Sequence, residues 1–144
     1  PGVLWSLYEL TGYAAVLEMA LGQTDKMSSV FSAPCSHDIG FQVNCSFGNA
    51  YRITGDKRYL PLIRRGADSL AARFNPRVGA TISWNPGERG IYPVIIDNMM
   101  NIELLEYSHR LFGADTLDSI ARTHAETTLR NHFRPDFTSW HMLD

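Results

Sequence analysis

The sequence predicts an all-α fold made of helical hairpins, and an internal repeat is the first observation behind this prediction. The segment YELTG at residues 8–12 recurs as YRITG at 51–55 and, more loosely, as HRLFG at 109–113. A phenylalanine lies 19 or 20 residues after the last glycine of each copy, at Phe31, Phe74 and Phe133. A proline follows each phenylalanine within three residues, so three copies of one unit are visible.

Each unit is expected to be a pair of helices joined at its glycine. Glycine can adopt the left-handed conformation that ends a helix, and Asp56 and Asp115 are placed to cap the helix that follows. The second helix of two units carries a one-sided apolar stripe, typical of an outer helix that covers an inner layer. The stripes are Leu60, Ile63, Ala67, Leu70 and Phe74, and Leu117, Ala121, Ala125, Leu129 and Phe133. Strand signals are weak, the strongest being at 80–84.

Composition and charge narrow the class of protein. The chain has 144 residues, of which 44% are hydrophobic, and its formal net charge is −2. These values fit a soluble globular domain rather than a disordered tail, and the charge argues against an electrostatic nucleic-acid or membrane binder. No apolar run in the sequence is long enough to span a bilayer. The spacing of Cys35 and Cys45 does not match a structural zinc site.

The repeat also aligns two acidic residues. Asp38 and Asp97 each stand 36 residues before the phenylalanine that ends their unit, which places each at the start of an inner helix. In a radial array of hairpins, these helix starts converge at one end of a central cavity, so the two carboxylates could face each other there. The alternative interpretation is that both aspartates are ordinary N-caps, because aspartate is among the preferred capping residues.

Two features favour a functional role over capping. Apolar neighbours on both sides of Asp97 are expected to desolvate its carboxylate, which favours the proton-donating form. His37, Trp84 and His141 lie at the same end of the repeats, and aromatic faces with nearby hydrogen-bond donors are a common way to bind sugar rings. The residues therefore suggest a carboxylate-driven reaction on a carbohydrate-like substrate.

Five ordered blocks of the sequence resemble the unsaturated glucuronyl hydrolases, glycoside hydrolase family 88. The blocks are SHDIGF at 36–41, SFGNAYR at 46–52, RFNP at 73–76, VIIDNMMN at 94–101 and NHFRP at 131–135. The resemblance implies an (α/α)6 barrel of six helical hairpins. On this basis residues 1–144 are expected to be a partial catalytic domain, truncated at both ends, that holds about three hairpins of the N-terminal half.

The resemblance also implies the chemistry and the roles of the residues. Such enzymes act on lyase-generated oligosaccharides, from glycosaminoglycans or similar polysaccharides, that carry a 4,5-unsaturated uronic acid at the non-reducing end. Asp97 matches the general acid and base, Asp38 matches a second aspartate that orients substrate, and His37, Trp84 and His141 match positions that hold or stack on the unsaturated sugar. The resemblance implies no metal and no organic cofactor.

Two alternatives stay open at this stage. Unsaturated rhamnogalacturonyl hydrolases share this fold and chemistry, although the quoted blocks fit them less well. A non-catalytic helical scaffold that binds glycans or protein partners is the alternative from a different class. The sequence leaves open the linkage and sulfation preference, and both the bacterial periplasm and the cytoplasm are compatible with it.

Overall fold

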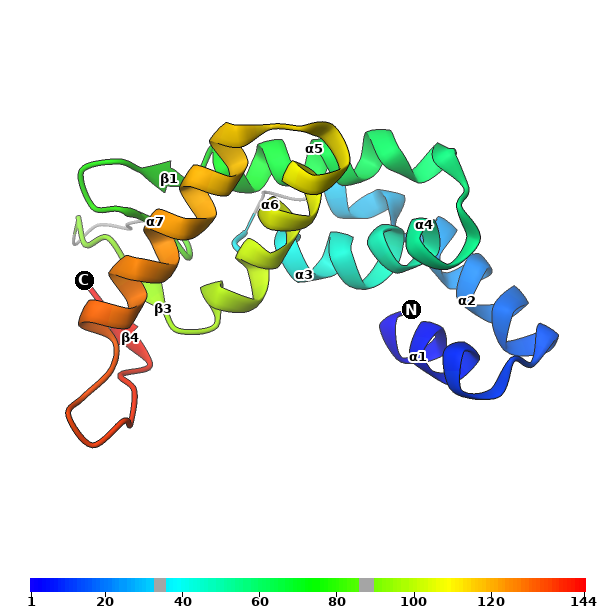
Figure 1. Cartoon of the computed structure of the whole chain (residues 1–144), viewed down its shortest axis with the longest axis horizontal. Helices are drawn as coiled ribbons and strands as arrows, with labels where there is room; N and C mark the ends of the chain where they lie inside the picture. The colour runs from blue at the N-terminus through cyan, green and yellow to red at the C-terminus, as the bar shows by residue number, and fades with distance from the viewer. Residues whose placement is uncertain (33–35, 86–89) are drawn as a thin grey trace.

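The computed structural model describes residues 1–32, 36–85 and 90–144, which form three helix pairs that follow one another along the molecule (Figure 1). The first pair is α1 (Gly2–Thr11) and α2 (Ala14–Lys26), which continues into the 3₁₀ helix η1 (Met27–Ser32). The second pair combines α3 (Ile39–Val43), the π-helical turn η2 (Asn44–Gly48) and α4 (Asn49–Thr54) with the 3₁₀ turn η3 (Lys57–Tyr59) and α5 (Leu60–Ala71). The third pair is α6 (Asn98–Phe112) and α7 (Asp115–Asn131). The predicted helical hairpins are therefore confirmed.

A glycine reverses the chain in every hairpin, as the repeat predicts. Gly12, Gly55 and Gly113 have φ values of 66°, 71° and 66°, the left-handed region that glycine adopts without a steric penalty. In each case the glycine N–H donates to a carbonyl four residues earlier, at Tyr8, Tyr51 and His109. These bonds satisfy carbonyl groups that the helix ends would otherwise leave free.

The predicted caps behave differently at the two equivalent turns. Asp56 accepts a hydrogen bond from the Arg58 N–H at 3.0 Å and caps η3, as expected. Asp115 does not cap α7, because Ala114 occupies the N-cap position and Asp115 already lies in the first helical turn. Both helices begin two residues after the glycine. The single residue between glycine and helix is Asp56 in the second hairpin but Ala114 in the third, so Asp115 is already the first helical residue. The prediction for Asp115 is therefore wrong.

The outer helix of the second hairpin buries the middle of its expected stripe, whereas α7 buries only the first two residues of its own, Leu117 and Ala121. Ile63, Ala67 and Leu70 of α5 are fully buried, but Leu129 and Phe133 are 67% and 44% exposed. Four residues turn a helix about 40° beyond a full turn, so a line drawn in constant steps of four drifts off the packed face. The line that α7 buries includes a step of three and runs through Leu117, Ala121, His124 and Thr128.

Close packing of α3 against α6 fixes the relation between the second and third hairpins. A methyl group on Gly40 would collide with the backbone of Asn101, so only glycine permits this approach. The Phe41 N–H donates to the Asn101 side-chain oxygen at 2.9 Å, and Asn101 is buried. Because both contacts lie in the first turn of each helix, they hold the starts of α3 and α6 side by side.

The described residues form four two-residue strands, which lie at the end of the molecule that also holds the C-terminus (Figure 1). β1 (Phe74–Asn75) pairs with β2 (Ala80–Thr81), and β3 (Val94–Ile95) pairs with β4 (Met142–Leu143), both antiparallel. The strand expected at 80–84 is thus present only in its first two residues. The second pairing brings the C-terminal segment beside the residues that lead into α6.

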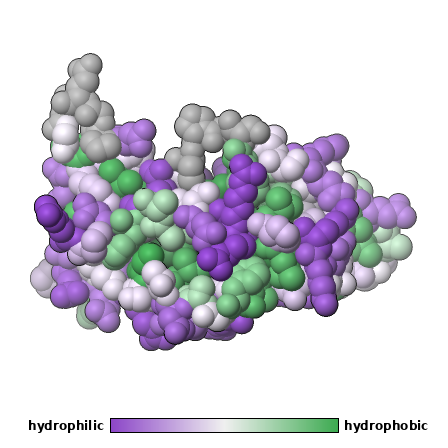
Figure 2. Space-filling view, turned by 90° about the horizontal axis from the view of Figure 1, so that it is seen from above, coloured by the Kyte–Doolittle hydropathy of each residue, from purple (hydrophilic) through white to green (hydrophobic). Residues whose placement is uncertain are grey.

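The described surface is mixed in character. Figure 2 shows hydrophobic patches distributed among strongly hydrophilic side chains on the face seen from above. None of the helices that the described residues form is long and apolar enough to cross a membrane.

Candidate active site

Asp38 and Asp97 stand immediately before α3 and α6, as the repeat predicts, but neither caps its helix. Each occupies the N-cap position, with φ and ψ in the right-handed helical region, and neither side chain makes a capping hydrogen bond. An N-cap residue normally has extended dihedral angles and accepts a bond from an N–H in the first turn. The capping interpretation therefore does not explain these two carboxylates.

The imidazole of His37 lies between the two carboxylates. Its Nε2 atom is 3.1 Å from Asp38 Oδ1 and 3.7 Å from Asp97 Oδ2. His37 is 8% exposed, whereas the side chains of Asp38 and Asp97 are 38% and 43% exposed. The structure therefore brings together the two predicted aspartates and adds a buried nitrogen that contacts both.

The carbonyl of Ser83 holds the other side of the His37 ring. His37 Nδ1 lies 2.7 Å from this oxygen, and the His37 backbone N–H donates to it at 3.3 Å. Arg73 donates to the same oxygen from Nη2 at 3.0 Å and to the Ile82 carbonyl from Nε at 2.9 Å. Residues on either side of the second hairpin, together with the segment that follows it, thus fix the orientation of a single imidazole.

Ser83 also ties this segment to the start of α6. Its hydroxyl donates to Asn98 Oδ1 at 3.1 Å and accepts from the Ile95 N–H at 3.0 Å. Ser83 and Asn98 are fully buried, and the Asn98 amide donates to the Thr81 carbonyl at 2.8 Å. These bonds position Asp97, which lies between Ile95 and Asn98 in the chain.

Sequence reasoning assigned no role to Arg73, Ser83, Asn98 or Asn101. Arg73, Asn98 and Asn101 lie within the blocks that carry the family resemblance, and Ser83 was noted only as the neighbour of Trp84. Membership of those blocks was therefore the only signal that could have pointed to three of them.

Trp84 and His141 also lie at this end of the hairpins. The Trp84 ring centroid is 6.2 Å from that of His37, the two planes are tilted by 56°, and Trp84 is 42% exposed. The His141 carbonyl accepts a bond from the Ile96 N–H at 2.9 Å, which brings residue 141 beside the residue that precedes Asp97. His141 is exposed. The Trp84 ring therefore lies beside the imidazole that contacts both carboxylates, whereas only the backbone of His141 is placed next to this site.

The expected desolvation of Asp97 is only partly present. Met99 and Met100, which were expected to help exclude water, are 37% and 61% exposed. One oxygen, Asp97 Oδ1, is nevertheless buried and has no hydrogen-bond partner within the described part of the chain. Half of this carboxylate is therefore shielded from water, while the side chain as a whole stays accessible to a ligand.

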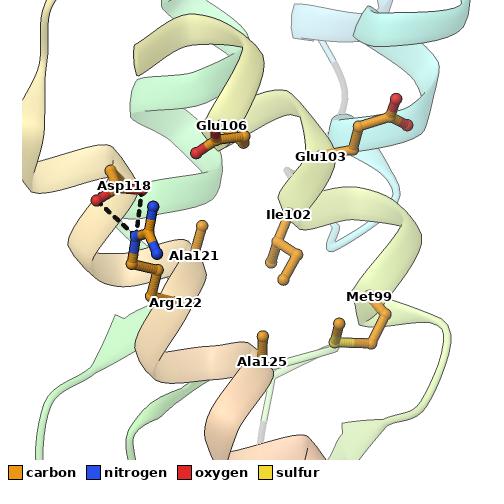
Figure 3. Close-up of a pocket in the computed structure, with 8 residues that line it drawn as sticks. All are labelled: Met99, Ile102, Glu103, Glu106, Asp118, Ala121, Arg122 and Ala125. Atoms are coloured by element: carbon orange, nitrogen blue, oxygen red, sulfur yellow. Dashed lines mark hydrogen bonds and ion pairs between the residues drawn. The ribbon is translucent and has the colours of Figure 1, made fainter. Parts of the chain in front are cut away.

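A separate groove lies between α6 and α7. Its walls are Met99, Ile102, Glu103, Glu106, Asp118, Ala121, Arg122 and Ala125 (Figure 3). Arg122 Nε donates to Asp118 Oδ1 at 2.7 Å, and this contact lowers the pKa of Asp118. The charges in the groove are thus partly paired, and neither Asp38 nor Asp97 lines it.

Within residues 1–32, 36–85 and 90–144, no group of three or more His, Cys, Asp and Glu side chains could hold a metal ion.

The described residues form helical hairpins that gather Asp38, Asp97, His37 and Trp84 at one end. The chain is homologous to a class of glycoside hydrolases that fold as helical barrels. No protein-family model matches the chain. An unsaturated glucuronyl hydrolase from Formosa agariphila is 38% identical over 146 residues, which covers 100% of this chain and 36% of that protein.

Solved structures agree with the sequence comparison. An unsaturated glucuronyl hydrolase specific for heparin is 44% identical and superposes with a TM-score of 0.94, covering 100% of this chain and 38% of the other. A variant of a hydrolase of this kind with dGlcA-Glc-Rha-Glc is 27% identical, with a TM-score of 0.89, covering 98% of this chain and 39% of the other.

The chain is homologous over its whole length to the N-terminal part of the unsaturated glucuronyl hydrolases, and it belongs with that family. It spans about a third of the length of the relatives it matches, rather than the half that was expected from three hairpins. Its three hairpins are accordingly part of the (α/α)6 barrel fold.

Proposed function

We propose that the protein carrying this chain hydrolyses oligosaccharides that end in a 4,5-unsaturated uronic acid, and that Asp97 is its general acid and base. The observation that carries the proposal is the meeting of Asp38 and Asp97 on one imidazole at the start of two adjacent inner helices. Homology to unsaturated glucuronyl hydrolases, including one specific for heparin, supports a glycosaminoglycan-derived substrate.

The reaction begins with proton transfer to carbon. The unsaturated uronate is an enol ether, so protonation of C4 by Asp97 leaves a positive charge shared between C5 and the ring oxygen. Water adds at C5 and gives its proton to the Asp97 carboxylate, which restores the acid. The resulting hemiketal opens to a ketone at C5, and the hemiacetal left at C1 releases the neighbouring sugar as an alcohol.

The surrounding residues bind and orient the sugar. Asp38 is partly exposed beside His37, where its free oxygen can accept a hydrogen bond from a sugar hydroxyl. Trp84 offers an exposed ring face for stacking on the pyranose, and His141 offers an exposed imidazole on the C-terminal segment. Partial exposure of these groups is compatible with a site that a sugar enters from solvent.

The test is loss of the ultraviolet absorbance of the conjugated double bond when the intact protein meets an unsaturated glycosaminoglycan disaccharide. Asp97→Asn keeps the shape of the side chain but cannot donate the proton, so kcat should fall by about a hundredfold or more. Asp118→Asn is the matched control, because Asp118 lies in the groove between α6 and α7 and is paired with Arg122. The control should keep its activity.

Two other results would contradict the proposal. Full activity in Asp97→Asn would show that another group protonates C4. Unchanged absorbance in the unsubstituted protein, together with retained binding of the disaccharide, would instead identify a non-catalytic glycan-binding scaffold.

A further inference from the structure

The two ring nitrogens of His37 both face hydrogen-bond acceptors. Nδ1 lies 2.7 Å from the Ser83 carbonyl oxygen, which can only accept, so this nitrogen must carry a hydrogen. Nε2 lies 3.1 Å from Asp38 Oδ1 and 3.7 Å from Asp97 Oδ2. A bare Nε2 would therefore direct its lone pair at two carboxylates. A second proton has to lie between this nitrogen and an oxygen.

The neighbouring groups decide which atom holds that proton. A proton on the nitrogen gives a charge-assisted hydrogen bond from Nε2 to Asp38 Oδ1, and the separation of 3.1 Å suits such a bond. Among the described residues, the charged groups that face His37 are Asp38 and Asp97, while the Arg73 cation donates to the same Ser83 oxygen. Two anions against one cation favour a positively charged ring.

His124 provides a contrast within the same chain. Its Nδ1 accepts a hydrogen bond from the Thr81 N–H at 2.9 Å, which is the reverse of the role of His37 Nδ1. His124 is fully buried, and burial lowers its pKa to about 4. The structure thus distinguishes a neutral imidazole in the packing layer from an imidazole surrounded by acceptors at the site.

We propose that His37 is a positioning residue that carries a positive charge between Asp38 and Asp97 and thereby sets the pH range in which Asp97 can act as an acid. This inference rests on the proposed function and goes beyond sugar binding by His37. The Ser83 carbonyl orients the ring so that the second N–H points toward Asp38, with Asp97 close enough to feel the charge. The cation favours the ionised form of Asp97 and limits the repulsion from Asp38.

The sign of the effect gives the test. If the His37 cation is removed, Asp97 keeps its proton to a higher pH, and the alkaline limb of the kcat–pH profile moves upward. A charge at this separation shifts such a limb by about one pH unit or more. His37→Gln in the intact protein removes the charge but keeps an amide that can still donate to Asp38. The profile is measured with an unsaturated disaccharide.

His109→Gln is the matched control. His109 Nδ1 lies 3.6 Å from Asp115 Oδ1 at the opposite end of α6, so the control removes a histidine beside an aspartate without touching the site. Its profile should coincide with that of the unsubstituted protein. A raised KM in His37→Gln with an unmoved alkaline limb would show that His37 only binds substrate, and the inference would be overturned.

A second measurement covers the case in which His37→Gln does not fold. In the ¹⁵N-histidine-labelled, unsubstituted protein at pH 7, both ring nitrogens of His37 should show the chemical shifts of protonated nitrogen. The resonances are assigned by their response to Asp38→Asn. A bare Nε2 would refute the inference, while the proposed function would stand if Asp97→Asn still abolished activity.

Discussion

The two ends of each hairpin are built differently. At the end where the helices reverse, a left-handed glycine and short backbone bonds complete the turn, and the side chains there are largely exposed. At the opposite end, the bond from the Ser83 hydroxyl to Asn98 and the bond from the Phe41 N–H to Asn101 hold the helix starts together. Two partly exposed carboxylates remain there. Changes at the turn end should therefore affect stability alone, whereas changes at the site end should affect both stability and activity.

The largest effect is expected where α3 meets α6. Gly40→Ala places a methyl group into the backbone of Asn101, which has no side-chain freedom with which to yield. We expect a loss of about 1–3 kcal/mol or more in the free energy of unfolding, together with a loss of activity, because the starts of the two helices move apart. Both are measured by denaturant unfolding and by the absorbance assay.

Gly22→Ala is the matched control for this substitution. Apart from the neighbouring backbone of α2 itself, no described atom lies within 4 Å of the position that a Gly22 methyl group would take, and alanine is the better helix former. Stability should stay the same or rise slightly. Equal destabilisation by the two substitutions would show that the α3–α6 contact is not special.

The second effect is the acid sensitivity of the packing beneath the site. The pKa of His124 is lowered to about 4 by burial, so the unfolded chain binds a proton near pH 6.5 that the folded chain binds only near pH 4. Above pH 6.5 the free energy of unfolding is therefore at its full value, and it falls as the pH is lowered from 6.5 toward 4, because only the unfolded chain then binds this proton. It amounts to up to about 3 kcal/mol.

Denaturant unfolding at several pH values measures this contribution. His124→Gln should flatten the dependence of unfolding free energy on pH between 4 and 6.5, whatever it does to stability at neutral pH. An unchanged slope in the variant would mean that His124 is protonated in the folded state.

The smallest effect is expected at the turn end, where two equivalent aspartates differ. Asp56 accepts the Arg58 N–H, so Asp56→Ala should cost about 1 kcal/mol. Asp115→Ala should cost less, because Asp115 makes no capping bond. Neither should change kcat. If Asp115→Ala were the more costly of the two, the assignment of the caps would be wrong.

These differences also explain what the sequence could reveal. A sequence repeat reflects a backbone unit that occurs several times in the fold. It therefore predicts the three hairpins, their glycine turns and the placement of Asp38 and Asp97. Because Asp38 and Asp97 occupy equivalent positions in the repeat, the sequence was sufficient to predict that their carboxylates meet. The orientation of His37 could not be predicted in the same way, because it depends on a backbone carbonyl at Ser83, 46 residues away.

The errors have local physical causes. One extra residue after Gly113 moved Asp115 from the cap into the helix. A single step of three rotated the buried line of α7 onto His124 and Thr128, which pack beneath β2, so part of the expected apolar stripe faces outward. Ser83 lies outside the helices, and its hydrogen bonds to Asn98 and Ile95 join residues far apart in the sequence, so they are visible only in three dimensions.

The most direct test of the account is a crystal structure of the intact protein carrying Asp97→Asn with an unsaturated glycosaminoglycan disaccharide bound. C4 of the unsaturated ring should lie within about 3–3.5 Å of the side chain at position 97, the separation of a reactive complex. Trp84 should flank the same ring, and His37 should remain bonded to the Ser83 carbonyl. A disaccharide whose C4 lies against a different acidic group would contradict the account.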